Sequence, residues 1–168
     1  IISFARSAAA AYGLPAGHWK QTVSTGNARI ERYFDALWRL RLERSYDNAN
    51  AANTAKTVLM RWDADGRKLF ESYPVRSVTS VDQVLNGSTW VYDGLGRLDT
   101  LQQSSELGLL TTRTEYLAGF TQKVTNPRGK TTSYGYQVFD DPEQPALRSL
   151  SAPEGVSLNI QRDRFGKA

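Results

Sequence analysis

The chain has 168 residues, a formal net charge of +4 and no cysteine. Its apolar content of 40% indicates one folded domain rather than a disordered chain, and the lack of cysteine excludes disulfides, thiol nucleophiles and cysteine-based zinc sites. The 21 basic and 17 acidic residues are spread along the sequence, which excludes a basic nucleic-acid arm, and no apolar run is long enough for a transmembrane helix.

Residues 1–28 are predicted to be a lead-in segment of loop and strand, before a single structural unit over residues 29–168. The stretch SAAAA in this lead-in is too short to form a helix alone and runs into Gly13 and Pro15. Arg6 lies where a signal peptide needs apolar residues, so none is expected. Because the chain starts without Met and ends just after a turn signal, we expect a piece of a longer protein.

Residues 29–168 are predicted to form an all-β fold of successive antiparallel hairpins. Apolar and polar residues alternate on both sides of each predicted turn, which is typical of half-buried strands. The predicted strands are 28–35, 39–45, 57–63, 67–73, 89–93, 97–103, 111–117, 120–126, 130–139 and 156–162. The predicted loops, rich in Asn, Ser, Pro and Gly, are 47–55, 74–88, 104–109 and 140–146.

Helix is predicted for at most one turn, at residues 80–87. Ser80 and Gln83 fit a capping box in which Gly87 is the stop. Asn86 and Gly87 fit a hairpin turn into the next strand equally well. The sequence leaves both alternatives open.

A five-residue motif recurs through the chain, with Asp or Asn first and Arg or Lys fifth, and with Gly fourth in all copies but the first. The copies are Asp35-Ala36-Leu37-Trp38-Arg39, Asp63-Ala64-Asp65-Gly66-Arg67, Asp93-Gly94-Leu95-Gly96-Arg97, Asn126-Pro127-Arg128-Gly129-Lys130 and Asp163-Arg164-Phe165-Gly166-Lys167. Partial copies occur at Tyr46-Asp47 and Phe139-Asp140. The spacing of the full copies varies, so the segments between them differ in length.

The motif predicts a tight turn that reverses the chain. Asp or Asn at the first position accepts a hydrogen bond from the backbone two residues on, and Gly at the fourth takes a positive φ without steric cost. The following Arg or Lys is expected to keep its charge in water while its stem covers apolar surface. The residues assigned to this structural role are Asp35, Arg39, Asp63, Gly66, Arg67, Tyr92, Asp93, Gly96, Arg97, Asn126, Gly129, Lys130, Asp163, Gly166 and Lys167.

Three copies depart from the pattern. Trp38 replaces Gly at the fourth position of the first copy, so that turn must close differently or tolerate a strain of roughly 1 kcal/mol. The fourth copy has Pro127, which suits a turn, but lacks the preceding tyrosine. In the fifth copy Arg162 stands where the aromatic residue belongs.

Catalytic interpretations are weak. His18 is the only histidine and could serve as a base in a Ser/His/Asp triad, but a surface or packing role is favoured. Two carboxylates could form a glycosidase pair, but most of the recurring Asp residues already hold a turn. Gly94 and Gly96 begin like a dinucleotide-binding loop, but Asp99 and a strand follow where a helix should start. We therefore predict no enzyme activity, no catalytic residues, no cofactor and no metal.

Tyr, Trp and Arg interleaved on strands could instead form a stacking platform for sugars or single-stranded nucleic acid. The alternation continues through every repeat rather than gathering in one patch, which favours packing. A carbohydrate- or surface-binding β-repeat module is the alternative function.

At RYFDALWRLRLERSYD, RWDADGRKLFESYP, VYDGLGRLDTL and NPRGKTTSYGY the chain resembles the Rhs or YD-repeat family, over most of residues 29–168. The resemblance implies a curved ribbon of antiparallel hairpins that winds into a larger hollow shell. In bacterial members this shell is the casing of a secreted polymorphic toxin. Some members carry an aspartyl self-cleavage segment, Asp-Pro-x-Gly-Leu, but here Asp141-Pro142 lacks the Gly-Leu, so no cleavage residues are assigned.

The resemblance implies a non-catalytic structural segment of a toxin casing that encloses a C-terminal effector. Its implied partners are neighbouring repeats of the same polypeptide and the enclosed toxin domain, with glycans under the alternative function, and no nucleic acid or membrane span is expected. The implied location is secreted or at the bacterial cell surface, as part of a larger exported protein.

Overall fold

The computed structural model describes residues 1–138 and 146–168, and it confirms the predicted all-β fold of successive antiparallel hairpins. Among the described residues, each strand pairs with its neighbours in sequence order. The chain divides into two compact units: unit 1 comprises Ile1–Trp90 and Gln103–Ser105, and unit 2 comprises Val91–Gln102 and Glu106–Ala168. The predicted lead-in over 1–28, the single unit over 29–168 and the larger shell stay predictions.

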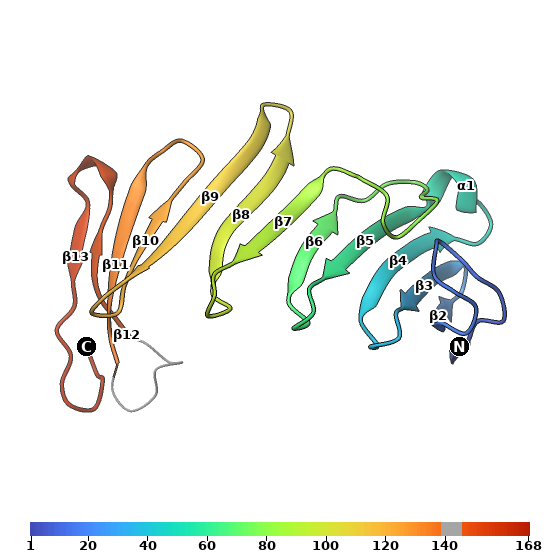
Figure 1. Ribbon diagram of the computed structural model, residues 1–168, viewed down its shortest axis with the longest axis horizontal. Helices are drawn as coiled ribbons and strands as arrows, with labels where there is room; N and C mark the ends of the chain where they lie inside the picture. The colour runs from blue at the N-terminus through green and yellow to red at the C-terminus, as the bar shows by residue number, and fades with distance from the viewer. Residues whose placement is uncertain (139–145) are drawn as a thin grey trace. The chain divides into compact units, whose positions relative to one another are not determined.

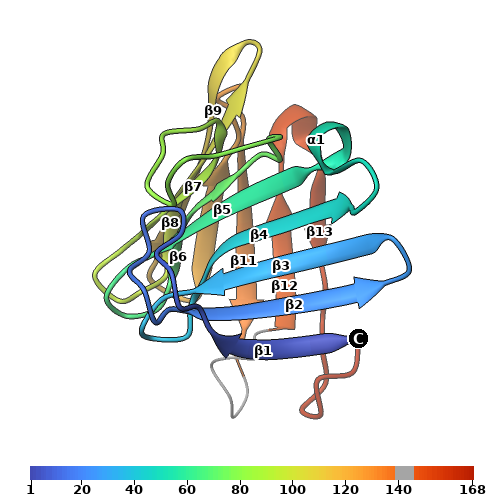
Figure 2. The same ribbon diagram turned by 90° about the vertical axis from the view of Figure 1, so that its right-hand side faces the viewer.

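Unit 1 is built on the first strands of the chain, and Figure 2 shows β1 to β5 side by side. Its elements are β1 (Ile2–Arg6), β2 (Trp19–Thr25), β3 (Ala28–Phe34), β4 (Leu40–Asp47), α1 (Ala51–Thr54), β5 (Lys56–Trp62), β6 (Lys68–Ser72) and β7 (Gly87–Tyr92). The last two residues of β7 belong to unit 2. The alternation of apolar and polar residues explains why these segments form strands, since successive side chains point to opposite faces.

Unit 2 continues with hairpins that Figure 1 draws in yellow to red. Its elements are β8 (Leu98–Ser105), β9 (Gly108–Leu117), β10 (Thr121–Thr125), β11 (Thr131–Gln137), β12 (Ala146–Ser151), a 3-10 turn (Pro153–Gly155) and β13 (Ser157–Asn159). The last three residues of β8 belong to unit 1. A register shift between Gly135 and Tyr136 interrupts the pairing of β11 with β12.

The structure corrects several predicted boundaries. Strand β12 was not predicted, because no motif turn borders it and its pairing comes from β11 and β13. Strand β13 covers only part of the predicted 156–162, and α1 lies inside the predicted loop 47–55. The end of the predicted strand 130–139, the partial copy Phe139-Asp140 and all but the last residue of the predicted loop 140–146 lie outside the described residues.

The segment 80–87 forms neither the predicted helical turn with a glycine stop nor a hairpin turn at Gly87. The Gln83 side chain accepts a hydrogen bond from the Thr79 backbone N–H at 2.9 Å, and the Ser80 hydroxyl accepts one from the Asp82 N–H at 3.2 Å. Gly87 instead begins β7, opposite Ser72. A Cβ there would lie 2.2 Å from the backbone oxygen of Glu71, so close strand approach explains this glycine.

The hydrophobic core of unit 1 lies between the sheet and two connecting segments. Its buried residues are Leu14, Tyr33, Leu42, Leu59, Val78 and Val81. Tyr33, Leu42 and Leu59 come from β3, β4 and β5, whereas Leu14 comes from the β1–β2 connection and both valines from the β6–β7 connection. These connections bond to each other, since the Val81 N–H donates to the Tyr12 carbonyl at 2.8 Å. Two long loops therefore close this core.

Unit 2 lacks such a core among its described residues, all of which are half-buried or exposed. Its exposed apolar side chains include Leu109, Leu117 and Phe120. Its strands are therefore held mainly by backbone pairing and by side chains that remain partly in contact with solvent.

Candidate functional site

The five motif copies form one kind of turn. In each, the N–H of the first residue donates to the carbonyl of the fifth at 2.8 to 3.0 Å, and the N–H of the fourth donates to the carbonyl of the first at 2.9 to 3.2 Å. The Oδ1 atom of the first residue also accepts a bond from the N–H of the fifth, at 2.8 to 3.0 Å. Asn126 accepts these bonds as the aspartates do, because its amide oxygen replaces the carboxylate oxygen.

The fourth position is left-handed in every copy. Its φ is +81° at Gly66, +79° at Gly96, +73° at Gly129 and +79° at Gly166. Trp38 adopts the same conformation, with φ +61°. The first turn therefore closes like the others and carries the strain of a large residue with positive φ.

In the first three copies the arginine at the fifth position binds the aspartate of its own turn. Arg39 Nε lies 2.8 Å from Asp35 Oδ2, and Arg67 Nε lies 2.6 Å from Asp63 Oδ2. In the third copy Arg97 Nη2 lies 2.7 Å from the Asp93 carboxylate. These arginine side chains remain partly exposed, and each also forms an ion pair that braces its turn.

These contacts lower the pKa of the three aspartates. At Asp35 and Asp63 burial acts to raise the pKa, but hydrogen bonds from the backbone and guanidinium of the arginine outweigh it. At Asp93 the backbone N–H of Arg97 is the main cause of the lowered pKa, and its guanidinium adds to the effect. All three carboxylates are held in the charged form by the turn itself.

Motif residues and their neighbours also join adjacent hairpins. Arg39 Nη1 donates to the Asp63 carbonyl at 2.7 Å, which connects the first two turns. The Trp62 indole N–H donates to the Leu40 carbonyl at 2.8 Å. Tyr92 is half-buried at the end of β7, directly before the third turn. The motif side chains whose contacts are described act within the sheet, which is a structural role.

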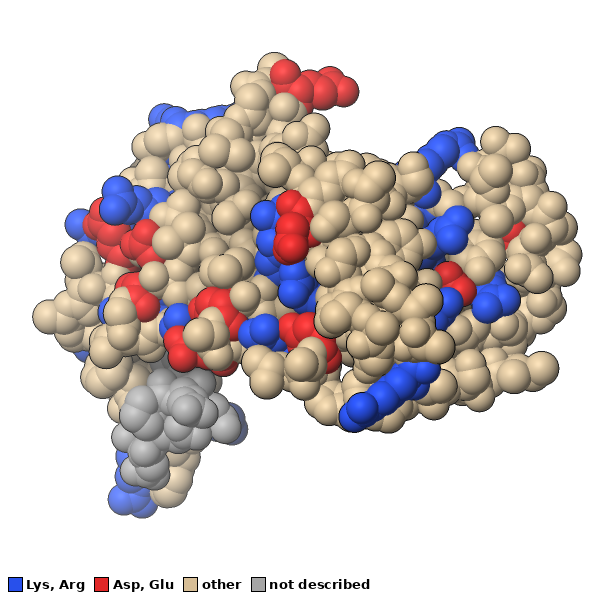
Figure 3. Space-filling view, turned by 45° about the vertical axis from the view of Figure 1, so that its right-hand side comes forward, with Lys and Arg blue, Asp and Glu red and all other residues tan. Residues whose placement is uncertain are grey.

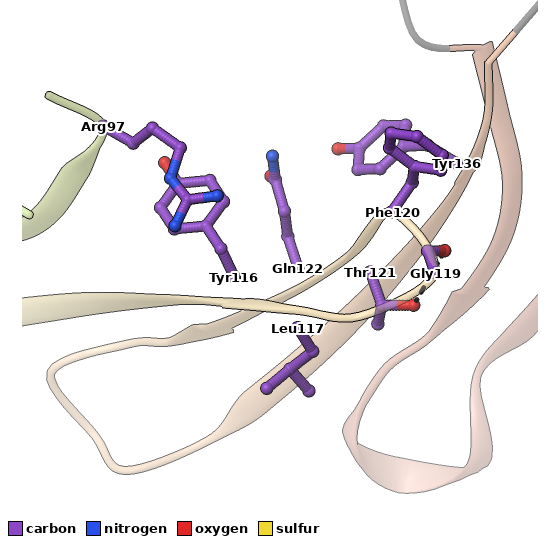
Figure 4. Close-up of a pocket in the computed structure, with 8 residues that line it drawn as sticks. All are labelled: Arg97, Tyr116, Leu117, Gly119, Phe120, Thr121, Gln122 and Tyr136. Carbon is purple, nitrogen blue, oxygen red and sulfur yellow. Dashed lines mark hydrogen bonds between the residues drawn. The ribbon is translucent and has the colours of Figure 1, made fainter. Parts of the chain in front are cut away.

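A cavity of about 400 Å³ lies in unit 2 (Figure 4). The Arg97 guanidinium lies 4.1 Å from the centre of the Tyr116 ring, a cation–π contact. Gln122 stands between Tyr116 on one side and Phe120 with Tyr136 on the other. Phe120 has φ +53° and is 58% exposed, so an aromatic residue with strained backbone borders this cavity.

A second cavity, of about 610 Å³, lies in unit 1. It opens between the first motif turn, the β1–β2 connection and the loop around Val81. Its aromatic wall is Trp19 and Trp38, its apolar lining includes Leu14, and polar groups come from Arg6, His18, Asp35, Arg41 and Asp82. Neither cavity was predicted from the sequence, because each is built by residues that lie far apart in the chain.

His18 is buried in the wall of the unit 1 cavity, in agreement with the packing role that the sequence favoured. Its Nδ1 lies 2.8 Å from the Pro15 carbonyl oxygen, which can only accept, so Nδ1 carries a proton. In a Ser/His/Asp triad that nitrogen faces a carboxylate instead. Across residues 1–138 and 146–168, no three His, Asp or Glu side chains are grouped as metal ligands.

Several basic side chains of unit 1 are paired with acidic ones. Figure 3 shows acidic side chains beside basic ones over the face in view. In unit 1 Glu31 is buried and contacts Lys20 at 2.8 Å and Arg29 at 3.3 Å, while Arg32 contacts Glu43 at 2.6 Å. Such pairing reduces the number of cations on β2 and β3 that are available for phosphate contacts.

In the part of the chain that the structure describes, no helix has the length and apolar character needed to cross a membrane. Comparison with protein-family models gives no match, and comparison with curated proteins gives none either.

Proposed function

We propose that this chain is a non-catalytic structural segment of a YD-repeat shell that encloses a C-terminal effector, as in Rhs-type polymorphic toxins. The observation that supports this proposal most is the repeated turn, whose hydrogen bonds recur in all five copies. Residues that recur with such a turn serve the fold, because their polar atoms are engaged in closing it. A repeated hairpin lengthens a sheet by the same unit each time, which suits an extended wall better than a single active site.

The open strand edges fit a segment within a longer sheet. Among the described residues β1 pairs only with β2, and β13 pairs only with β12. An unpaired edge is a template for a further strand. We propose that neighbouring repeats of the same polypeptide supply these strands and cover the half-buried side chains of unit 2.

The enclosed C-terminal effector is the second proposed partner, and the whole protein is proposed to act outside the bacterium or at its surface. No nucleic-acid partner is proposed, since the described basic side chains of β2 and β3 are paired with acidic ones. No cofactor is proposed, because a casing acts by separating the enclosed effector from its surroundings and catalyses no reaction.

Limited proteolysis of the full-length gene product tests the enclosure. We expect the region that follows this chain to resist protease as long as the shell is intact, and to be cut rapidly when the same region is expressed alone. Equal rates of cleavage in the two contexts would contradict the shell.

The behaviour of the 168-residue chain in solution is a second test. Unpaired edges favour association, so we expect light scattering to show oligomers and thermal unfolding to be less cooperative than in the full-length protein. A monomer that unfolds as cooperatively as the full-length protein would contradict the shell segment and favour a self-sufficient binding module.

A further inference from the structure

Trp38 occupies the position that the other four turns give to glycine. Its φ of +61° is strained for a residue with a large side chain, yet the side chain is 54% exposed. The turn would close with glycine, as its hydrogen bonds are the same in the other copies. Residues with strained backbone are found more often at ligand-binding positions, so the Trp38 indole is a candidate for a binding role.

The Trp38 indole belongs to a cluster of stacked rings at one end of the unit 1 sheet. It lies 4.6 Å from the ring centre of Trp19, with 25° between the planes, and 5.4 Å from that of Phe4. The guanidinium of Arg6 lies 5.2 Å from the Trp19 ring. Stacking fixes the orientation of the indole and presents a rigid, partly exposed aromatic surface.

This surface forms one wall of the unit 1 cavity. At about 610 Å³ the cavity falls within the size range of small-molecule sites, and apolar and polar groups both line it. Its charges are balanced: Arg41 is paired with Asp82 at 2.8 Å, and Asp35 is paired with Arg39 at 2.8 Å. A strongly anionic ligand such as a nucleic acid would find few unpaired cations here.

His18 lies in the wall of this cavity. The residue is only 6% exposed, and its Nε2 has no hydrogen-bond partner among the described residues. Because Nδ1 carries the proton that binds Pro15, the neutral ring has a lone pair on Nε2. That atom is itself closed off from solvent, so the hydroxyls of a ligand would be bonded by the other polar groups of the lining.

We propose that the unit 1 cavity binds a pyranose ring of a glycan. The apolar C–H face of the sugar stacks on the indole of Trp38. Arg6 and Asp82, which also line the cavity, offer a donor and an acceptor for the sugar hydroxyls. A sugar fits this lining because it combines an apolar face with a rim of neutral hydroxyls. This binding site goes beyond a structural casing, which needs no ligand.

The four tryptophans allow the test to be made on the unmodified chain. Methyl glycosides of glucose, galactose, mannose and N-acetylglucosamine are titrated separately while the indole N–H resonances are recorded by NMR. We expect at least one glycoside to shift the resonances of Trp19 and Trp38 with a single saturating dependence, and to leave Trp62 and Trp90 unchanged. No saturable shift with any of them, or equal shifts of all four indoles, would overturn the proposal.

Two matched variants locate the site. Trp38→Gly restores the glycine of the repeated turn and should weaken binding by at least about tenfold through loss of the stacked face. Phe120→Gly makes the same kind of change at the other cavity, at a residue with φ +53°, and should leave binding unchanged. Unaltered affinity in Trp38→Gly, or shifts of Trp19 and Trp38 by a mononucleotide but by no glycoside, would overturn the sugar site.

Discussion

Unit 1 and unit 2 share the same turn but differ in what their strands bury. The turns at Asp35 and Asp93 have matching hydrogen bonds, one in each unit. Yet the fully buried apolar side chains of the described chain, such as Leu42 and Leu59, all lie in unit 1. The repeated motif therefore specifies strand pairing in both units, but it does not specify a core.

The difference comes from the connections that are not motif turns. In unit 1 the β1–β2 and β6–β7 connections are long and return over the sheet, where Leu14 and Val81 complete the core. In unit 2 the β8–β9 and β9–β10 connections are short turns that contribute no covering layer. A core thus arises where a long connection brings apolar residues back to the sheet, since a sheet face alone cannot exclude water.

The largest expected effect separates the two units. Leu42 has no exposed surface, so Leu42→Ala should lower the free energy of unfolding by about 2–5 kcal/mol. Leu150→Ala, at a half-buried position of β12 in unit 2, should cost less than about 1 kcal/mol, because part of that side chain is already in water. Urea unfolding of both variants measures the two values.

Tryptophan fluorescence and far-UV circular dichroism, recorded during the same urea unfolding, also distinguish the two units. All four tryptophans lie in unit 1, so their fluorescence follows unit 1, whereas far-UV circular dichroism follows the strands of both units. We expect the dichroism signal to begin to change at lower urea than the fluorescence. Coincident transitions, or equal losses from the two leucine variants, would show that the units share their stability.

A smaller effect is expected at the turns. Gly96 has φ +79°, so Gly96→Val should cost roughly 1–3 kcal/mol because a β-branched residue resists that conformation. Gly94→Ala is the control: its φ is not in the left-handed region, and a Cβ there would meet no atom within 4 Å. Equal stability of the two variants in a urea melt would contradict the left-handed role assigned to Gly96.

Most of the fold was predictable because its signals are local. The turn needs only five consecutive residues, so its position, its left-handed residue and the strands on either side could be read from the sequence. Strand β12 could not, since it borders no motif turn and its place is set by pairing with β11 and β13. Helix α1 is a single turn within a stretch rich in Asn, and such short elements leave no periodic signal.

The cavities could not be predicted, because each depends on contacts between distant segments. Trp19, Trp38 and Asp82 all line the unit 1 cavity. No sequence pattern in the β6–β7 connection predicts that Asp82 lies near the two tryptophans. The contact of Arg39 with the Asp63 carbonyl is likewise set by the pairing of neighbouring hairpins. The sequence signal for the unit 1 cavity is Trp38 in place of glycine, but the sequence alone does not show that this indole stacks on Trp19 and borders a cavity.

The smallest expected effect concerns the first aspartate of the motif turn. Its replacement should change the stability of the two units by similar amounts. The turn lowers the pKa of Asp35 in unit 1 and of Asp93 in unit 2 below their ordinary values. A lowered pKa in the folded state means that the ionised carboxylate stabilises the fold above the pKa of the unfolded chain, about 3.9, and that this contribution is lost as the pH falls through the folded value. Asp35→Asn and Asp93→Asn should therefore be slightly less stable than the wild type at pH 7.

Asn126 shows that an amide keeps the Oδ1 hydrogen bonds of the turn, so each variant loses mainly the charge. We expect the stability difference from the wild type to shrink towards zero as the pH falls through the lowered pKa of the folded state, because the wild-type carboxylate is then protonated as well. Urea melts from pH 7 to pH 2 measure this difference for both variants. A difference that persisted at pH 2, or that appeared in only one unit, would mean that the aspartate acts through packing particular to that unit and not through the turn that the two units share.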